Sequence, residues 1–147
     1  MESDAAGSSA RRPEYRGCFA CGQDNPIGLK LTFACQDGAA HAVFVPSPEH
    51  QGYPGRLHGG LICTLLDEAM AYAMKTSGQE GYTARLEVRF HRAVRLKEPV
   101  TVEAHVVRTR GRLVELEARL LDTSGTALAT AAGKYITAPV SQPGKAL

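Results

Sequence analysis

Two glycines that follow a histidine, in the segment His58-Gly59-Gly60, open the one long helical pattern of this 147-residue sequence. The first N–H groups of a helix have no partners inside the helix, and the helix dipole places partial positive charge behind them. Since glycine has no side chain to shield these amides, this helix end can polarise a bound carbonyl group and stabilise an oxyanion formed from it. The alternative is that the glycines only allow the helix to pack closely on a sheet.

A second candidate group is the acidic pair Asp67-Glu68 inside the same helical pattern. Asp67 lies seven residues after Gly60, two helical turns on, at roughly 100° from the centre of the apolar stripe. A carboxylate there can act as a general base on water or attack a carbonyl carbon as a nucleophile, and the sequence leaves both roles open. Glu68 is the competing acid. It lies about 200° from the stripe centre, so we expect it to face solvent.

Further polar side chains flank this helix in the sequence. Thr83, at the start of the following strand pattern, offers a hydroxyl group that can donate and accept hydrogen bonds. His58 can either contact the reacting group or hold the loop in shape, and both roles stay open. We expect a bound molecule to meet residues on the loop, on the helix and on the following strand. This expected binding set is Gly60, Gln51, His50, Glu68, Arg89 and Arg92.

The helix that must position these groups covers about residues 59–76. Its apolar residues recur every three or four positions, as one buried stripe requires. Gly78 follows the helix as a natural C-terminal stop. The stripe consists of Ile62, Leu65, Leu66, Ala69, Met70 and Ala73.

The rest of the chain alternates with a period of two, which is typical of half-buried strands. Two short strands are expected before the helix, joined by Asp37-Gly38, a strong hairpin signal. Four strand patterns follow the helix, with short breaks that suit antiparallel neighbours. The pattern therefore predicts the α+β class, with an antiparallel sheet that covers one long helix. The expected strands are 29–35 and 39–45, then 84–90, 100–106, 114–120 and 127–137.

Length and composition limit the possibilities. The chain fits one domain, which we expect over 17–138 between disordered tails at 1–16 and 139–147. A net charge of +2 is too small to imply nucleic acid or an anionic membrane as the main partner. The sequence has no apolar run long enough to span a bilayer and no apolar core of a secretory signal. Its four cysteines, without such a signal, indicate reduced thiols in the cytoplasm.

The pair Cys18-x-x-Cys21 is the feature that suggests a metal ion. Structural zinc takes four ligands, often from two such pairs, and this chain has only one. Cys35, His41 or His50 would have to complete the site. We therefore assign no metal ligand and no cofactor to this protein.

Three features together resemble the signature of hotdog-fold acyl-CoA thioesterases, in particular the phenylacetyl-CoA thioesterase-like family. They are His58-Gly59-Gly60 at the start of the helix, an acid nine residues after that histidine, and Thr83 at the start of the next strand. The resemblance covers about residues 18–137. It implies a hotdog fold, in which a curved antiparallel sheet wraps around one long central helix.

The resemblance also implies an activity, the hydrolysis of an acyl-CoA thioester to a free acid and coenzyme A. It assigns the carbonyl contact to Gly59 and the role of general base or nucleophile to Asp67, with Thr83 orienting the acid or the water. Since a thiolate leaves readily, no strong general acid is needed. Coenzyme A enters as part of the substrate, and its phosphates would suit Arg89 and Arg92.

The same resemblance implies a homodimer, or a dimer of dimers, in which Gly59 and Asp67 of one site come from different chains. An isolated hotdog sheet has an exposed edge, which proteins generally cover. The alternative function is a non-catalytic module that binds acyl-CoA or lipid. Hydratases of the same fold are disfavoured, because their signature after Asn25-Pro26 needs a histidine where this chain has Gly28.

Overall fold

The computed structural model of the protein describes residues 15–138. Residues 1–14 and 139–147, where disordered tails are expected, lie outside the described residues. Tyr15 and Arg16, the last residues of the expected N-terminal tail, are described, and the Tyr15 hydroxyl donates to Glu80 at 2.9 Å. In this part of the chain no helix has the length and apolar character that crossing a membrane requires. The cytoplasmic location stays a prediction.

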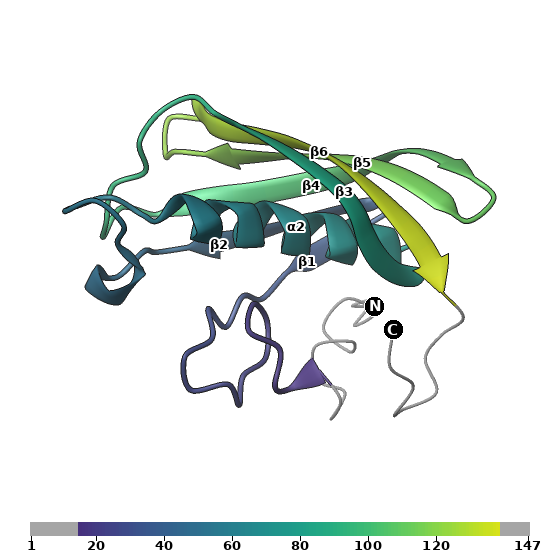
Figure 1. Ribbon diagram of the computed structural model, residues 1–147, viewed down its shortest axis with the longest axis horizontal. Coiled ribbons are helices and arrows are strands. Elements are labelled where there is room, and N and C mark those ends of the chain that lie inside the picture. Colours follow the sequence, from purple (N-terminus) through teal and green to yellow (C-terminus); the bar gives the residue numbers. More distant parts are fainter. Residues whose placement is uncertain (1–14, 139–147) are drawn as a thin grey trace.

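Between residues 15 and 138 the chain forms one long helix and one six-stranded antiparallel sheet. The elements are β1 (Ala34–Gln36), β2 (Ala39–Phe44), the 3-10 helix η2 (Pro48–His50), α2 (Gly59–Lys75), β3 (Glu80–Phe90), β4 (Val100–Arg110), β5 (Leu113–Leu121) and β6 (Ala127–Ala138). The strands follow the order β1-β2-β4-β5-β6-β3 across the sheet. The sheet curves over α2, as Figure 1 shows, which confirms the predicted α+β class and its central helix.

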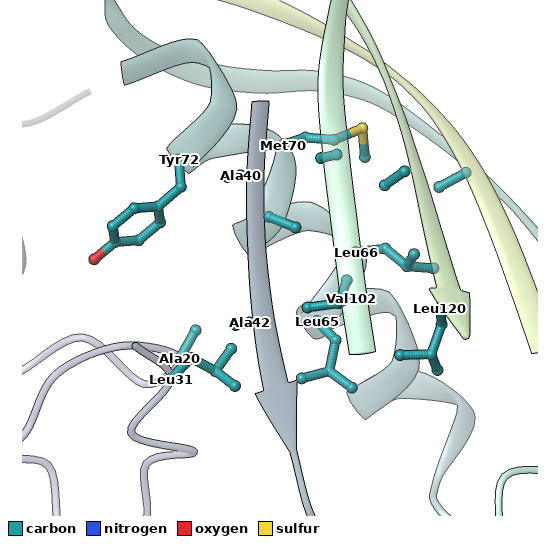
Figure 2. Packing of buried hydrophobic residues seen from close by; sticks show 14 of the residues in the cluster. Ala20, Leu31, Ala40, Ala42, Leu65, Leu66, Met70, Tyr72, Val102 and Leu120 are labelled. Carbon is teal, nitrogen blue, oxygen red and sulfur yellow. The ribbon is translucent and has the colours of Figure 1, made fainter. Parts of the chain in front are cut away.

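The core lies between α2 and the concave face of the sheet. All six residues of the predicted stripe are buried, and Leu65 and Leu66 are completely inaccessible. Figure 2 shows both leucines close to Val102 of β4 and Leu120 of β5. Full burial of one such side chain contributes about 1.5–3 kcal/mol. Gly78 ends the helix as expected, because its positive φ of 73° lets its N–H group donate to the Lys75 carbonyl.

A second face of α2 is covered by the N-terminal segment, residues 15–33, which we call the N-terminal cover. Figure 1 shows this segment as loops below α2 and β1, and its contacts with α2 include the one between Cys18 and Glu68. The Phe33 ring stacks on Tyr72 with 4.4 Å between the ring centroids. Tyr72 and Met74 lie outside the predicted stripe but are buried. The helix is therefore enclosed on two sides.

The N-terminal cover corrects one predicted strand. Residues 29–33 of the expected strand 29–35 do not pair as part of a β-strand, and β1 begins only at Ala34. The reason is local: Lys30 has a positive φ of 53°, and the Leu29 and Leu31 amides donate to the Phe19 and Ala20 carbonyls at 2.9 and 3.0 Å. The expected hairpin turn is confirmed, since Asp37 and Gly38 both have positive φ, as a type I′ turn requires.

Strand β3 lies at the edge of the sheet, because it pairs with β6 and not with β4, the next strand in the chain. Its pairing with β6 sets Thr83 opposite Tyr135, next to a bulge between Thr83 and Arg85. Within the described residues the other edge of β3 has no strand partner. The strand thus presents both a candidate site residue and an open edge.

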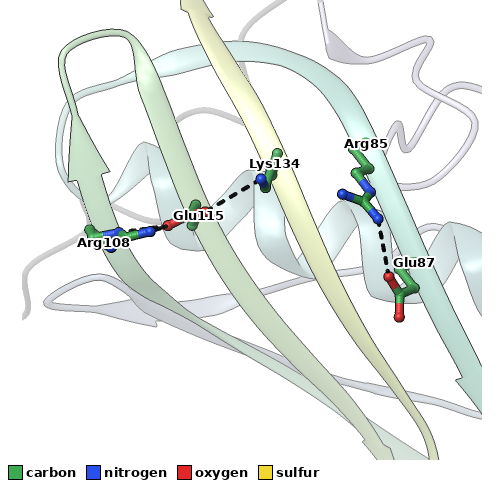
Figure 3. Close-up of polar contacts among 5 residues, drawn as sticks. All are labelled: Arg85, Glu87, Arg108, Glu115 and Lys134. Atoms are coloured by element: carbon green, nitrogen blue, oxygen red, sulfur yellow. Dashed lines mark hydrogen bonds and ion pairs between the residues drawn. The ribbon is translucent and has the colours of Figure 1, made fainter.

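The convex face of the sheet is polar. Glu115 of β5 lies between Arg108 of β4 at 2.6 Å and Lys134 of β6 at 3.7 Å, a row of charges visible in Figure 3. Arg85 and Glu87 form a further pair on β3 at 3.5 Å. Pairs this exposed contribute only about 0–1 kcal/mol each. They keep this face solvated, so the stability of the fold depends on the core.

Leu66→Ala tests this dependence. Removing a fully buried side chain leaves a cavity, so the free energy of unfolding should fall by about 3–5 kcal/mol in a urea titration followed by circular dichroism. The matched control is Val107→Ala, because Val107 of β4 is 52% exposed and its truncation should cost no more than about 0.5 kcal/mol. Equal losses in both variants would contradict this placement of the core.

Candidate active site

The Asp67 carboxylate, near the middle of α2, is held by two hydroxyl groups from the sheet. Thr83 donates to Asp67 Oδ1 at 2.7 Å. Tyr135 donates to the same oxygen at 2.6 Å, and its hydroxyl also lies 3.1 Å from the Asp67 backbone carbonyl. Among residues 15–138 no donor contacts Oδ2. One carboxylate oxygen is therefore fixed by two hydrogen bonds, and the other accepts none from the described residues.

Of the two residues that donate to Asp67, Tyr135 is the one that the sequence analysis did not predict. It points inward from β6 and is buried, and burial, followed by the charge of Asp67, raises its pKa well above the ordinary value. The hydroxyl thus stays protonated and remains a donor. A Cβ at Gly133 would lie only 2.7 Å from the Tyr135 ring, so that glycine makes room for it. The available signal was one tyrosine and one glycine among alanines on the inward face of the last strand.

The N-terminus of α2 presents one open amide. His58 caps the helix, and its Nδ1 accepts the Gly60 N–H group at 2.9 Å. The His58 carbonyl accepts the amides of the two residues after Gly60, Leu61 and Ile62. In the described part of the chain the Gly59 amide has no acceptor. The geometry gives His58 a capping role and leaves the Gly59 N–H group without an acceptor among the described residues.

Gly59 lines a groove of about 800 Å³ at this helix end. Phe90 of β3 forms one wall, and its ring would lie 3.6 Å from a Cβ at Gly59. Arg56 and Arg92 also line the groove, and both are exposed. An apolar wall beside two guanidinium groups suits a ligand with an apolar part and an anionic part. Arg56 was not among the candidates from sequence, because its loop carries no regular pattern.

Several of the expected binding residues lie elsewhere. His50 Nδ1 accepts the Ser47 N–H group at 3.0 Å, and Gln51 Oε1 accepts the Gly55 N–H group at 3.3 Å, so both side chains shape the loop. Arg89 is exposed, 3.9 Å from Glu87. Of the expected binding set only Arg92 lines the groove; His50, Gln51, Gly60, Glu68 and Arg89 do not.

The expectation that Glu68 faces solvent is wrong. Its carboxylate is half-buried beneath the N-terminal cover, with Oε1 3.9 Å from Cys18 Sγ. Burial, aided by the charge of Cys18, raises the pKa of Glu68 to about 7. Helical periodicity places Glu68 opposite the apolar stripe, but it carries no information about an irregular segment that covers this face. Asp67 is therefore the acid on the side of β3.

Comparison with known proteins supports the family assignment that these features suggest. The family model of the thioesterase superfamily matches residues 54–129 of this chain. The match includes α2 with its N-terminal glycines and Asp67, together with Thr83 on β3. It ends before Tyr135.

Two curated relatives share part of this region. A protein of Saccharolobus solfataricus named as a candidate esterase is 32% identical over 84 residues, which cover 56% of this chain and 55% of that protein. The acyl-coenzyme A thioesterase THEM4 of Bos taurus is 30% identical over 96 residues, which cover 64% of this chain and 39% of that protein. The chain spans about half the length of the curated relatives it matches.

Solved structures confirm the hotdog fold. The crystal structure of a thioesterase superfamily protein superposes with a TM-score of 0.76 and 26% identity, covering 80% of this chain and 61% of that chain. A hypothetical thioesterase protein of Streptococcus pneumoniae TIGR4, solved with coenzyme A, has a TM-score of 0.67 and 19% identity. The superposition covers 69% of this chain and 82% of that chain.

Tyr135→Phe tests the hydrogen bond from Tyr135 to Asp67. The ring stays in place but the hydroxyl donor to Oδ1 is lost, so the free energy of unfolding should fall by about 1.5–3 kcal/mol, the usual range for a hydrogen bond to a charged group. Urea unfolding at pH 7 measures the difference. Tyr82→Phe is the matched control, because Tyr82 is 44% exposed. If both variants unfold at the same urea concentration as the unmodified protein, the contact contributes nothing.

Proposed function

Because the chain belongs to the thioesterase superfamily, we propose that it hydrolyses acyl-CoA thioesters in a site shared between two copies of itself. The observation that carries this proposal is the Asp67 carboxylate, held by Thr83 and Tyr135 through one oxygen and open at the other. On the same helix lies the open Gly59 amide. The pair supplies the two functions that thioester hydrolysis needs, an activated nucleophile and an oxyanion donor.

In the proposed reaction the thioester carbonyl oxygen accepts the Gly59 N–H group. Asp67 Oδ2 either takes a proton from water, whose oxygen attacks the carbonyl carbon, or attacks that carbon itself before water releases the acid. The oxyanion that forms is stabilised at the helix N-terminus. It then expels coenzyme A, whose thiol has a pKa near the ordinary value of about 8.5 and which leaves readily as a thiolate.

The distance between the two groups supports a site built from two chains. Gly59 and Asp67 are eight residues apart on α2, which is about 12 Å along the axis at 1.5 Å per residue. Reacting atoms must approach to about 3–3.5 Å, so one carbonyl group cannot use both residues of one helix. Two helices that lie antiparallel bring Gly59 of one chain next to Asp67 of the other.

The exposed edge of β3 offers the surface for such pairing. This eleven-residue strand is free on one side within residues 15–138, and it carries exposed Tyr82 and Phe90. Long edges of this kind are generally covered in soluble proteins. If two copies pair edge to edge through β3, the two-fold axis sets their helices antiparallel. We therefore include self-association in the proposal.

Coenzyme A as the carrier is supported by charge and by the relatives. Arg56 and Arg92 line the groove at Gly59 and can meet phosphate groups. The relative from Bos taurus is named an acyl-coenzyme A thioesterase, and the Streptococcus pneumoniae protein was solved with coenzyme A. The apolar wall at Phe90 provides surface for the acyl group.

The choice of Asp67 and Thr83 is supported by a spacing. Two further structures of the Streptococcus pneumoniae protein carry alanine in place of one aspartate and of one threonine, sixteen positions apart. Asp67 and Thr83 are separated by the same number of residues. The two side chains that form the hydrogen bond in this chain thus match the spacing of the pair altered there.

Asp67→Asn tests the reaction. The variant should lower kcat by about 10²–10⁴-fold on whichever acyl-CoA the unmodified protein hydrolyses, measured as thiol release from a panel of short, long and aromatic acyl-CoAs. The matched control is Asp37→Asn, because Asp37 lies in an exposed turn with positive φ, a conformation that asparagine accepts. Its activity should equal that of the unmodified protein.

The outcomes separate the two candidate functions. Turnover by the unmodified protein and by Asp37→Asn, but not by Asp67→Asn, supports the thioesterase. If acyl-CoAs bind without turnover, and Asp67→Asn binds them equally well, the protein is a binding module of the same fold. Hydrolysis that Asp67→Asn leaves unchanged would reject the role of this residue.

Mixing two inactive variants tests whether the site is shared. Gly59→Pro removes the N–H group that the carbonyl would need, while proline at the first helical position is well tolerated, and His58 already has the extended backbone that precedes proline. Alone it should lose about 10²–10³-fold in kcat. After co-refolding with Asp67→Asn at equal amounts, about a quarter of the activity should return, because half of the dimers are mixed and each has one intact site.

This recovery depends on the two residues acting from different chains. If Gly59 and Asp67 of the same chain formed a site, every subunit in the mixture would carry one defect and no activity would return. Circular dichroism and the size of each variant in gel filtration control for folding and assembly. Recovery with no mixed dimers present would also contradict the shared site.

A further inference from the structure

A second cluster of reactive groups lies on a different face of α2, outside the groove at Gly59. Cys18 Sγ, Cys21 Sγ and a carboxylate oxygen of Glu68 all lie within 4.8 Å of one another. Cys18 and Cys21 come from the N-terminal cover, and Glu68 comes from the helix beneath it. The proposed hydrolysis uses none of the three.

We propose that Cys18, Cys21 and Glu68 bind one thiophilic divalent metal ion of the zinc class, which ties the N-terminal cover to α2. Tetrahedral zinc with sulfur ligands at about 2.3 Å and oxygen at about 2.0 Å separates neighbouring ligand atoms by about 3.5–3.8 Å. Cys18 Sγ and Glu68 Oε1 are 3.9 Å apart. Closing the whole cluster onto an ion requires side-chain shifts of about 1 Å or less.

The local backbone holds the two thiols in a ligand-like arrangement. The Cys21 N–H group points at Cys18 Sγ at 3.5 Å, and the Gly22 N–H group donates to the Cys18 carbonyl at 2.8 Å. A side chain at Gly22 would collide with the Arg16 carbonyl and with the Cys18 backbone, so the turn requires glycine. Backbone N–H groups aimed at a sulfur stabilise it as a thiolate, the form that binds metals.

The charge balance of the cluster favours a cation. Two thiols and a carboxylate are gathered in a half-buried to buried position, where each negative charge would repel the others. The Lys75 ammonium group, on the same helix, lies over the rings of Tyr15 and Tyr72 at 4.7 and 4.5 Å. Its charge offsets that of Glu68 only in part, since the pKa of Glu68 is still raised. A divalent ion would neutralise the cluster and replace its protons.

Glu68 supplies the ligand that the sequence did not reveal. Cys35, His41 and His50 are absent from the cluster, which within residues 15–138 contains only its three members. Three protein ligands leave a fourth position for water. Because the N-terminal cover contains little regular structure, an ion that joins it to α2 adds its binding free energy to the stability of the fold.

Metal titration of the full-length protein tests the inference. The reduced, metal-free chain is titrated with Zn²⁺ in competition with a chromophoric chelator, and with Co²⁺, whose absorption reports thiolate ligation. One equivalent should bind. Cys21→Ser should weaken the affinity by about 100-fold or more and Glu68→Gln by about tenfold or more. Cys35→Ser is the matched control, since Cys35 is a half-buried thiol outside the cluster, and its affinity should not change.

A second readout guards against variants that fail to fold. Zn²⁺ should raise the Tm of the unmodified protein and of Cys35→Ser, and the shift should shrink in Glu68→Gln, which keeps the shape of the side chain. The inference is overturned if the reduced protein binds no stoichiometric Zn²⁺, or if Co²⁺ gives no thiolate absorption. It is also overturned if Cys21→Ser and Glu68→Gln, both folded by circular dichroism, bind Zn²⁺ as tightly as the unmodified protein.

Discussion

The packing of α2 into the curved sheet determines where every candidate functional group lies. Burial of the helix's apolar stripe fixes its rotation, and that rotation turns Asp67 toward β3 and β6, where Thr83 and Tyr135 donate to it. The same packing leaves the first helical amide, at Gly59, at the surface of the groove. Because a helix is rigid along its axis, the separation of Gly59 and Asp67 is fixed too. A chemistry that needs both groups at one atom therefore needs a second helix.

Helices and strands that bury only one face could be predicted, because one-sided burial leaves a regular repeat of apolar residues in the sequence. A stripe repeating every three or four residues has to face a core, and all of its predicted members, including Leu65 and Leu66, are buried. Alternation with a period of two gave the inward faces of β4 and β5 for the same reason, with Val102 and Leu120 fully covered. The Asp37-Gly38 turn followed from backbone sterics alone. In each case the local sequence pattern already contains the condition that the folded structure has to meet.

Features that depend on contacts between distant or irregular segments could not be predicted in this way. Tyr135 reaches Asp67 only because β6 pairs with β3, a neighbour that chain order does not suggest. The burial of Glu68 depends on the N-terminal cover, which forms no regular element, and the positive φ of Lys30 interrupts the extended backbone there. The groove residue Arg56 could not be predicted either, because it lies on a loop without a regular pattern. Spacing identified Asp67 as a candidate, whereas its hydrogen-bond partners required the three-dimensional arrangement.

The contrast between Asp67 and Glu68 follows from one property of the helix, a turn of about 100° per residue. Adjacent carboxyl groups therefore meet different surroundings. Asp67 meets hydroxyl donors that stabilise its charge and leave one oxygen open, whereas Glu68 meets thiols and burial, which raise its pKa to about 7. A group that is charged and partly open suits proton transfer or attack, while a group that is costly to charge without a partner suits the binding of a cation. Because both belong to one helical turn, whatever fixes Glu68 against the N-terminal cover also restrains the backbone that carries Asp67.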